Sequence, residues 1–173
     1  PASLARRGSR SVVTGEVVGA TVGLMPMLVA LRGSRAAVWH AVEHKSIAAY
    51  EAGGPDEVAR AGEHAKEHPR CGSNLVLPMV LTSGVVNIVI RGLGRRAGAP
   101  VRLIGAGVAL GAAVELFAFA DRQPGHPVAR LIHGAGHAIQ AGFVTREPEE
   151  RDMVVGRRAM EELLEAEGVA PAR

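Results

Sequence analysis

The sequence predicts an all-α fold: a small helical membrane protein with about three hydrophobic helices, a histidine-rich helical hairpin and an amphipathic C-terminal helix. Three observations predict this class. Three long stretches are almost free of charge, 47% of the residues are hydrophobic although only 3% are aromatic, and 22 of the 173 residues are glycine. Aromatic side chains dominate the cores of soluble proteins, whereas small residues let helices approach closely in lipid. The length suits one domain, so we predict a single domain over residues 1–173.

The three hydrophobic runs cover residues 11–31, 72–90 and 103–120. Each is close to the roughly 20 residues that an α-helix needs to cross a bilayer. A single run of this kind could equally be a buried helix of a soluble protein, but three of them in one short chain favour a multi-pass membrane protein. Glu16 is the only charge in the first run and Glu115 the only charge in the third. Their role stays open, because each could face a polar cavity or reach water near a helix end.

The segment "RGLGRRAGAPVR", residues 91–102, separates the second and third runs and carries four arginines without an acid. Short basic loops of membrane proteins tend to face the cytoplasm, so we predict a protein of the cytoplasmic membrane with the lipid bilayer as its partner. The side on which the histidine-rich hairpin lies stays open. The net charge is +3, but the basic residues do not gather on one predicted face with aromatic residues between them. We therefore predict no nucleic-acid binding.

Histidines recur at a spacing of four, and six of the seven fall into such pairs: His40 and His44, His64 and His68, His133 and His137. Residues four apart share one face of a helix. The first two pairs read "HAVEH" and "HAKEH", both of the form H-x-x-E-H, which is an inverted zinc-protease signature. In that arrangement two imidazoles bind zinc and the glutamate takes a proton from the metal-bound water. The alternative is that these are solvated surface helices in which the short motif arose by chance.

The region of residues 36–71 is predicted to be a helical hairpin. A first helix over residues 36–52 should end at Gly53 and Gly54, and a second helix should begin at Pro55 and end at Pro69. Helices joined by so short a turn run antiparallel. The only cysteine follows the second helix, so it is a free thiol or a metal ligand. The hairpin could thus place His40 and His44 opposite His64 and His68, with Cys71 just after it as a further candidate metal ligand.

Two further helices are predicted after the hydrophobic runs, over residues 128–167. Residues 128–144 carry a polar stripe that includes His133 and His137, which suits a helix at the membrane interface or over a polar cavity. These histidines could be a second ligand pair or interfacial residues without a metal. Residues 148–167 are highly charged with one apolar side, which is typical of an amphipathic helix packed on the rest of the protein.

Three blocks, "WHAVEHKSIAAYEAG", "HPRCGSNLVL" and "VTREPEERD", resemble in order and spacing the YqhQ-like bacterial family, a domain of unknown function described as a predicted metal-dependent enzyme. The resemblance implies a small membrane-associated protein with a histidine-rich metal centre, and a short member without the family's N-terminal block. It also implies motif residues by matching position: His40, Glu43, His44, Lys45, His68, Arg70, Cys71, Glu115, Gln140, Thr145, Arg146 and Glu147. The family pattern does not include His64, His133 or His137.

The expected function is that of a membrane-embedded metal-dependent enzyme, most simply a zinc hydrolase. Two of the candidate ligands, His40 and His44, would hold the metal together with His68 or Cys71. Glu43 would be the general base, and Lys45 or Arg70 would neutralise negative charge on a substrate oxygen. On a helix Glu43 points about 100° away from the histidine that follows it, so whether its carboxylate reaches the metal-bound water stays open.

Two other functions remain as alternatives. The metal could be structural and could staple an accessory subunit of a larger membrane complex or of a homo-oligomer. Alternatively, the carboxylates and histidines could form part of an ion or proton path. Zinc is the most probable metal by chemistry, although imidazole and thiolate also bind iron, copper and nickel. The sequence does not determine the substrate, so whether the protein is an enzyme stays open.

Overall fold

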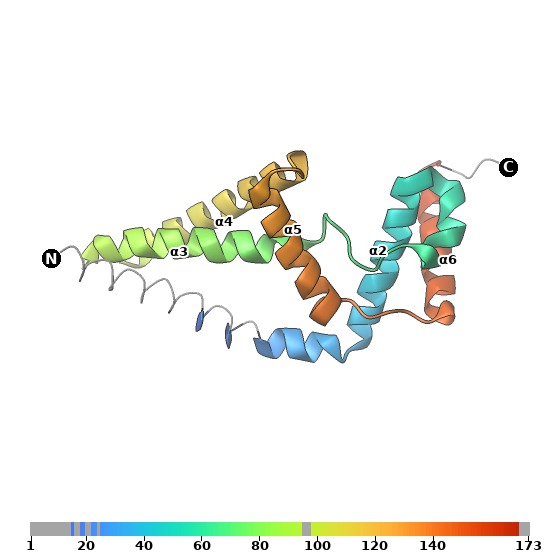
Figure 1. Cartoon of the computed structure of the whole chain (residues 1–173), viewed down its shortest axis with the longest axis horizontal. Coiled ribbons are helices and arrows are strands. Elements are labelled where there is room, and N and C mark those ends of the chain that lie inside the picture. Colours follow the sequence, from blue (N-terminus) through green and yellow to red (C-terminus); the bar gives the residue numbers. More distant parts are fainter. Residues whose placement is uncertain (1–14, 16–17, 20–21, 24, 95–97, 170–173) are drawn as a thin grey trace. The chain divides into compact units, whose positions relative to one another are not determined.

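The computed structural model describes residues 15, 18–19, 22–23, 25–94 and 98–169, which form helices and connecting segments without a β-strand (Figure 1). The described elements are α2 (Arg35–Gly53), the 3-10 helices η1 (Gly54–Glu63) and η2 (Gly72–Leu75), α3 (Val76–Gly92), α4 (Ala99–Arg122), α5 (Pro127–Ile139), the π-helical turn η4 (Gln140–Val144) and α6 (Glu150–Ala166). The all-α prediction is confirmed for this part of the chain. The chain divides into two compact units, unit 1 (Pro1–Pro26 and Gly72–Gly136) and unit 2 (Met27–Cys71 and His137–Arg173).

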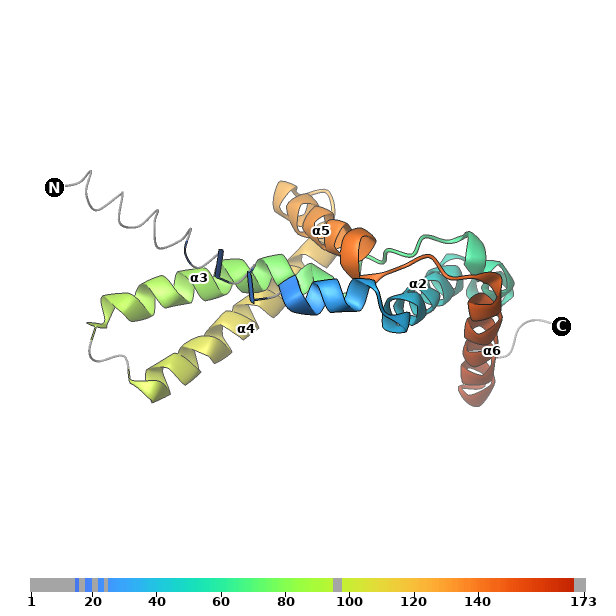
Figure 2. The same cartoon turned by 90° about the horizontal axis from the view of Figure 1, so that it is seen from below.

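Unit 1 is built on a hairpin of α3 and α4, whose helices run side by side in both views (Figure 2). Small and polar residues set their close approach. A Cβ atom on Gly105 would lie only 2.6 Å from Cδ1 of Ile90, so the side chain of Ile90 packs directly over this glycine. Nearby, the hydroxyl group of Thr82 lies 2.9 Å from the carbonyl oxygen of Ala109. A small residue thus allows close approach at Gly105, whereas Cβ atoms added to Gly107 and Gly111, the glycines repeated four apart in the third hydrophobic run, would meet nothing within 4 Å.

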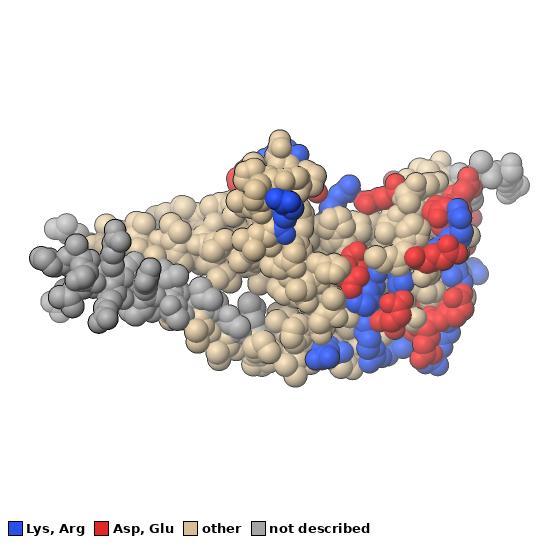
Figure 3. Space-filling view, viewed as in Figure 1, with Lys and Arg blue, Asp and Glu red and all other residues tan. Residues whose placement is uncertain are grey.

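Two stretches of the hairpin are long and apolar enough to cross a membrane, Gly72–Gly92 and Ala99–Arg122, with mean hydropathies of 1.8 and 2.0. Only 11% and 22% of these windows are buried, whereas the core helix of a soluble protein is mostly buried. On the face shown in Figure 3, few charged side chains lie over the hairpin, while acidic and basic side chains mix over unit 2. The first predicted run, residues 11–31, falls partly outside the described residues, as does Glu16; residues 25–32 are helical.

Helix α5 and the end of α4 form the small core of unit 1. Ala120, Ala129 and Ile132 are fully buried there, with Leu77 and Leu116 packed against them. The helix predicted over residues 128–144 begins one residue earlier and changes at residue 140 from α-helical to π-helical hydrogen bonding. This change in the hydrogen-bond pattern has no signature in the sequence.

In unit 2, α2 packs against η1 and α6 around a core of Val42, Ala49, Ala61 and Met153. Gly156 brings α6 close to α2, because a Cβ atom there would lie 2.2 Å from Cγ1 of Val42. Helix α6 begins two residues after the predicted start. Glu149 is the N-cap residue and forms a capping box with Asp152, so the first helical residue is Glu150 rather than Pro148.

The structure confirms the first helix of the predicted hairpin and corrects the second. Helix α2 is within one residue of the predicted bounds, and Gly54, with a φ of 72°, ends it as only glycine readily does. The second helix does not reach Pro69. It is a 3-10 helix that ends at Glu63, after which residues 64–68 are not helical. His64 and His68 are therefore not one helical turn apart.

Long-range hydrogen bonds explain why this second helix stops. The ammonium group of Lys45 donates to the carbonyl oxygens of Gly62 and His64, at 3.1 and 2.6 Å. Two residues further on, the ring of His44 lies 2.7 Å from the carbonyl oxygen of Lys66. These carbonyl oxygens accept from side chains of α2 instead of from backbone N–H groups of a continuing helix.

Candidate metal centre

Three of the four candidate ligands converge in unit 2. The ligand atoms of His40, His44 and Cys71 all lie within 4.8 Å of one another. Nε2 of His40 and Sγ of Cys71 are 3.5 Å apart, which is about the separation of roughly 3.3–3.8 Å that a tetrahedral zinc ion imposes on two of its ligands. The two imidazole rings are 4.3 Å apart between centroids. Two imidazoles and one thiol therefore surround a common point and could hold a metal ion.

The orientation of both imidazoles is set by backbone carbonyl groups. Nδ1 of His40 lies 3.0 Å from the carbonyl oxygen of Val144, and Nδ1 of His44 lies 2.7 Å from that of Lys66. A carbonyl oxygen only accepts hydrogen bonds, so in each neutral ring Nδ1 carries the hydrogen and Nε2 carries the lone pair. A ligating histidine usually donates its other ring N–H in this way, which fixes its tautomer for the metal.

The helix α2 supplies both histidines from successive turns, on a face that also buries Ala37 and Ala41. His44 is 4% exposed, whereas His40 and Cys71 are half-buried. Burial lowers the pKa of His44, but hydrogen bonds with Cys71 and with the Lys66 carbonyl group outweigh it and raise the pKa above its ordinary value. The thiol and this imidazole thus interact closely, as neighbouring ligands of one ion would.

A buried glutamine fixes the segment that carries the thiol. Oε1 of Gln140 accepts a hydrogen bond from the backbone N–H of His68 at 2.7 Å, and its Nε2 donates to the carbonyl oxygen of the same residue at 3.1 Å. Gln140 is 1% exposed and begins the π-helical turn η4. Cys71 follows three residues after His68, and its backbone N–H bonds to the His68 carbonyl oxygen. The amide of Gln140 therefore holds the backbone from which the thiol reaches the histidines.

The family described as "Protein of unknown function (DUF1385)" matches residues 27–166, which is 140 of the 173 residues. The chain belongs to the DUF1385 family. The matched region contains every described helix from α2 to α6, and with them the three converging ligands. No curated protein and no solved structure matches the chain.

The fourth candidate ligand of this DUF1385 member, His68, lies beside the group but uses both ring nitrogens elsewhere. Its Nε2 is 3.1 Å from Oε2 of Glu51, and its Nδ1 accepts from the backbone N–H of Arg70 at 3.3 Å. The centroid of its ring is 5.7 Å from that of His44. Of the alternatives His68 and Cys71 for the third ligand, the geometry favours the thiol.

The predicted catalytic residues have different surroundings. Lys45 is 4% exposed, and besides its two backbone carbonyl partners it forms an ion pair with Glu147 at 2.8 Å. Its three ammonium hydrogens can thus all be bonded inside unit 2. Arg70 is exposed and pairs with Glu51 at 2.7 Å. Glu43 is exposed on α2, and its charge acts on the neighbouring His44.

The remaining singled-out residues lie outside the three-ligand group. Nε2 of His64 is 3.4 Å from Glu57, and Nε2 of His133 is 3.3 Å from the carbonyl oxygen of Ala120. His137 and Glu115 are exposed. The predicted ion path would need carboxylates facing one another inside the membrane, and Glu16 lies outside the described residues, so that hypothesis stays a prediction.

Several groups that orient the ligands of the DUF1385 member were not predicted from its sequence. Glu51 links His68 to Arg70, and the Val144 carbonyl group fixes the ring of His40. The resemblance pointed to Gln140 and Thr145 without a role. The Thr145 hydroxyl group donates to the Gln140 carbonyl oxygen at 2.9 Å, which closes the π-helical turn that presents the Val144 carbonyl group. A backbone carbonyl has no signature in a sequence, so only the side chains of this set could have been suspected.

Proposed function

We propose that this protein is a membrane-embedded metal-dependent hydrolase whose unit 2 binds a divalent ion, most simply zinc, through His40, His44 and Cys71. One observation carries the metal site: two imidazoles, each held by a backbone carbonyl group through Nδ1, direct Nε2 toward one thiol. A set of two imidazoles and one thiolate suits zinc, and the fixed tautomers reduce the cost of binding it.

The number of ligands supports a catalytic rather than a closed structural site. Structural zinc sites have four protein ligands, whereas catalytic sites have three and leave one position for water. The nearest further histidine, His68, is engaged by Glu51 and by the backbone of Arg70. Bound zinc would lower the pKa of a water molecule toward neutrality, which is the chemistry that hydrolysis needs.

The membrane part of the proposal is supported by unit 1. Its two apolar stretches are long enough to span a bilayer, and side chains such as Leu103, Ile104 and Val85 are more than 60% exposed. Large exposed apolar surfaces of this kind are rare in soluble monomers and suit contact with lipid. The bilayer of the bacterial cytoplasmic membrane is the environment that we propose, as the resemblance to YqhQ-like proteins also implies.

The metal site is tested by elemental analysis of the full chain, purified in detergent without chelators. We expect about one zinc per chain in the wild type and a loss of stoichiometric zinc in Cys71→Ser and His40→Ala. His137→Ala is the matched control, because this histidine belongs to the same unit, is exposed and lies outside the ligand group. Cobalt substitution adds an independent readout, since a thiolate ligand gives a charge-transfer absorption that Cys71→Ser should remove. Wild-type protein that binds no divalent metal would refute the proposal.

A structural staple is the second candidate, and the position of the ligands favours it. Both histidines belong to α2 and the thiol to the end of the segment after η1, so one ion would tie two separate parts of unit 2 together. Glu43→Gln separates the two functions. A hydrolase should keep its zinc and lose turnover across a panel of lipid-ester and peptide substrates. A staple should keep zinc and show no turnover in either form, while chelation lowers its thermal stability.

A further inference from the structure

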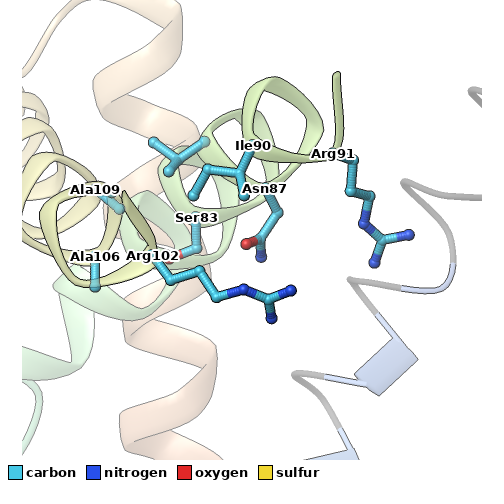
Figure 4. A pocket seen from close by; sticks show the side chains of 9 residues that line it. Ser83, Asn87, Ile90, Arg91, Arg102, Ala106 and Ala109 are labelled. Carbon is cyan, nitrogen blue, oxygen red and sulfur yellow. The ribbon is translucent and has the colours of Figure 1, made fainter. Parts of the chain in front are cut away.

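The α3–α4 hairpin contains a second polar site, which is separate from the metal centre. A cavity of about 710 Å³ opens near the loop end of the hairpin (Figure 4). This volume falls in the range of about 300–1,000 Å³ that is usual for small-molecule sites. Nine described residues line it, and none of them is acidic. Its polar lining consists of Ser83, Asn87, Arg91 and Arg102.

The polar lining is ordered by the helices. Ser83, Asn87 and Arg91 follow one another at a spacing of four along α3, so they occupy one face of that helix. Arg102 comes from the start of α4 and lines the same cavity as these three residues (Figure 4). Gly105 and Ala106 of α4 line another part of the cavity, where they add no polar group.

We propose that this cavity, named the hairpin pocket, binds the phosphate group of an anionic phospholipid. Guanidinium groups form paired, charge-assisted hydrogen bonds with phosphate, and Arg91 and Arg102 supply two of them. The Asn87 amide and the Ser83 hydroxyl group add neutral donors. Arg91 lies in the last turn of α3 and Arg102 in the first turn of α4, where membrane spans end and lipid phosphates lie.

General surface attraction is the competing explanation. Arginines at the ends of membrane helices often extend toward the interface without forming a site. That explanation requires only positive charge near the lipid. It does not require the neutral Asn87, which lies one helical turn before Arg91 on the same face of α3. Nor does it require a cavity that is lined by both helices. Substitutions that keep the charge can therefore separate a pocket from a charged rim.

The test measures lipid binding to the full-length chain in neutral detergent by native mass spectrometry, with phosphatidylglycerol and phosphatidylcholine as probes. We expect the wild type to prefer phosphatidylglycerol. Arg102→Lys keeps the charge but loses the paired geometry, and Asn87→Leu changes no charge. Each should weaken phosphatidylglycerol binding by about ten-fold, the effect expected for a lost hydrogen bond to a charged group. Arg122→Gln is the matched control, because this exposed arginine ends α4 away from the pocket lining, and it should leave binding within about two-fold of the wild type.

Further arms distinguish the source of the phosphate and a loss of fold. Ala106→Leu narrows the pocket without touching a polar group and should also weaken binding. The helix content and the melting temperature, measured on the same samples, should stay at the wild-type values and so report that unit 1, which contains the pocket, is intact. Inorganic phosphate that binds alone, while phosphatidylglycerol does not, would replace the lipid by a soluble phosphate and overturn the proposal. Equal losses in Arg122→Gln and Arg102→Lys, or wild-type binding in Asn87→Leu, would also overturn it.

Discussion

Gln140→Leu tests whether the pair of hydrogen bonds between Gln140 and the backbone of His68, named here the glutamine clamp, holds the Cys71 thiol in place. The amide of Gln140 makes two hydrogen bonds with the backbone of His68, at 2.7 and 3.1 Å, and the residue is 1% exposed. Leucine is similar in size but forms no hydrogen bond. The substitution therefore removes the clamp without opening a large cavity and without touching any of the three ligands.

The magnitude follows from the two lost bonds. Each contributes about 1 kcal/mol net, and a buried polar group that loses its partner costs about 1–3 kcal/mol. We expect the free energy of unfolding of unit 2 to fall by about 2–4 kcal/mol. Cys71 lies three residues beyond the clamped backbone, so the zinc affinity should fall as well, by the roughly 10–100-fold that loss of a supporting hydrogen bond causes in metal sites.

The assay is a zinc titration of the purified full-length chain in competition with a chelating dye, together with denaturant unfolding. Gln123→Leu is the control, because this exposed glutamine lies just after α4 in unit 1. Gln140→Glu keeps the acceptor for the His68 N–H but buries a charge against the His68 carbonyl oxygen, so it should destabilise unit 2 at least as much as Gln140→Leu. If Gln140→Leu binds zinc like the wild type while Cys71→Ser does not, the clamp does not position the thiol and the reasoning is refuted.

Three further predictions concern packing, charge and pH. Gly156→Ala should lower the free energy of unfolding by about 1–3 kcal/mol in denaturant titrations, because its Cβ atom would overlap α2. Gly134→Ala is the control and should stabilise the protein slightly, because its Cβ atom would meet nothing within 4 Å. Equal effects of the two substitutions would contradict this prediction. Lys45→Met should lower it by about 2–4 kcal/mol and keep wild-type zinc content, and loss of zinc from a folded variant would instead indicate a role at the metal. The hydrogen bond from Arg35 lowers the pKa of Asp152, so this carboxylate stabilises the fold above its unfolded pKa and the contribution is lost as the pH falls below about 4. The melting temperature of Asp152→Asn should therefore fall less than that of the wild type as the pH is lowered. Identical pH profiles of the two proteins would argue against the Arg35–Asp152 ion pair.

Local signals in the sequence predicted the bounds of α2 to within one residue and those of α6 to within two. The pair Gly53 and Gly54 predicted the end of α2, and the structure shows why, because Gly54 adopts a positive φ. The uncharged runs predicted α3 and α4, since their length and composition alone distinguish them. By contrast, "HAKEH" has a helical spacing but not a helical backbone. Its carbonyl groups bond to Lys45 and His44, which are about 20 residues earlier, and such contacts cannot be inferred from local pattern.

The candidate site was predictable where side chains carry it. The pair His40 and His44 and the single cysteine were all expected as ligands, and they are the three that converge. His68 was included because both the predicted hairpin and the family resemblance pointed to it. In the extended segment its ring instead faces Glu51. The fold rather than the motif thus decides which histidine joins the thiol.

The polar residues of "HAVEHK" on α2 differ in burial, and this difference indicates different roles. Lys45 lies about 100° beyond His44 on the buried side and donates to the carbonyl oxygens of Gly62 and His64, so it holds the end of η1 against α2. Glu43 lies about 100° before His44 and is exposed. Alone among the polar side chains of this motif, it makes no hydrogen bond or ion pair with the described part of the chain. The fold accounts for the histidines and the lysine but does not require this carboxylate, so its substitution leaves folding and metal binding intact and isolates chemistry. That is why Glu43→Gln, more than any ligand variant, distinguishes a hydrolase from a staple.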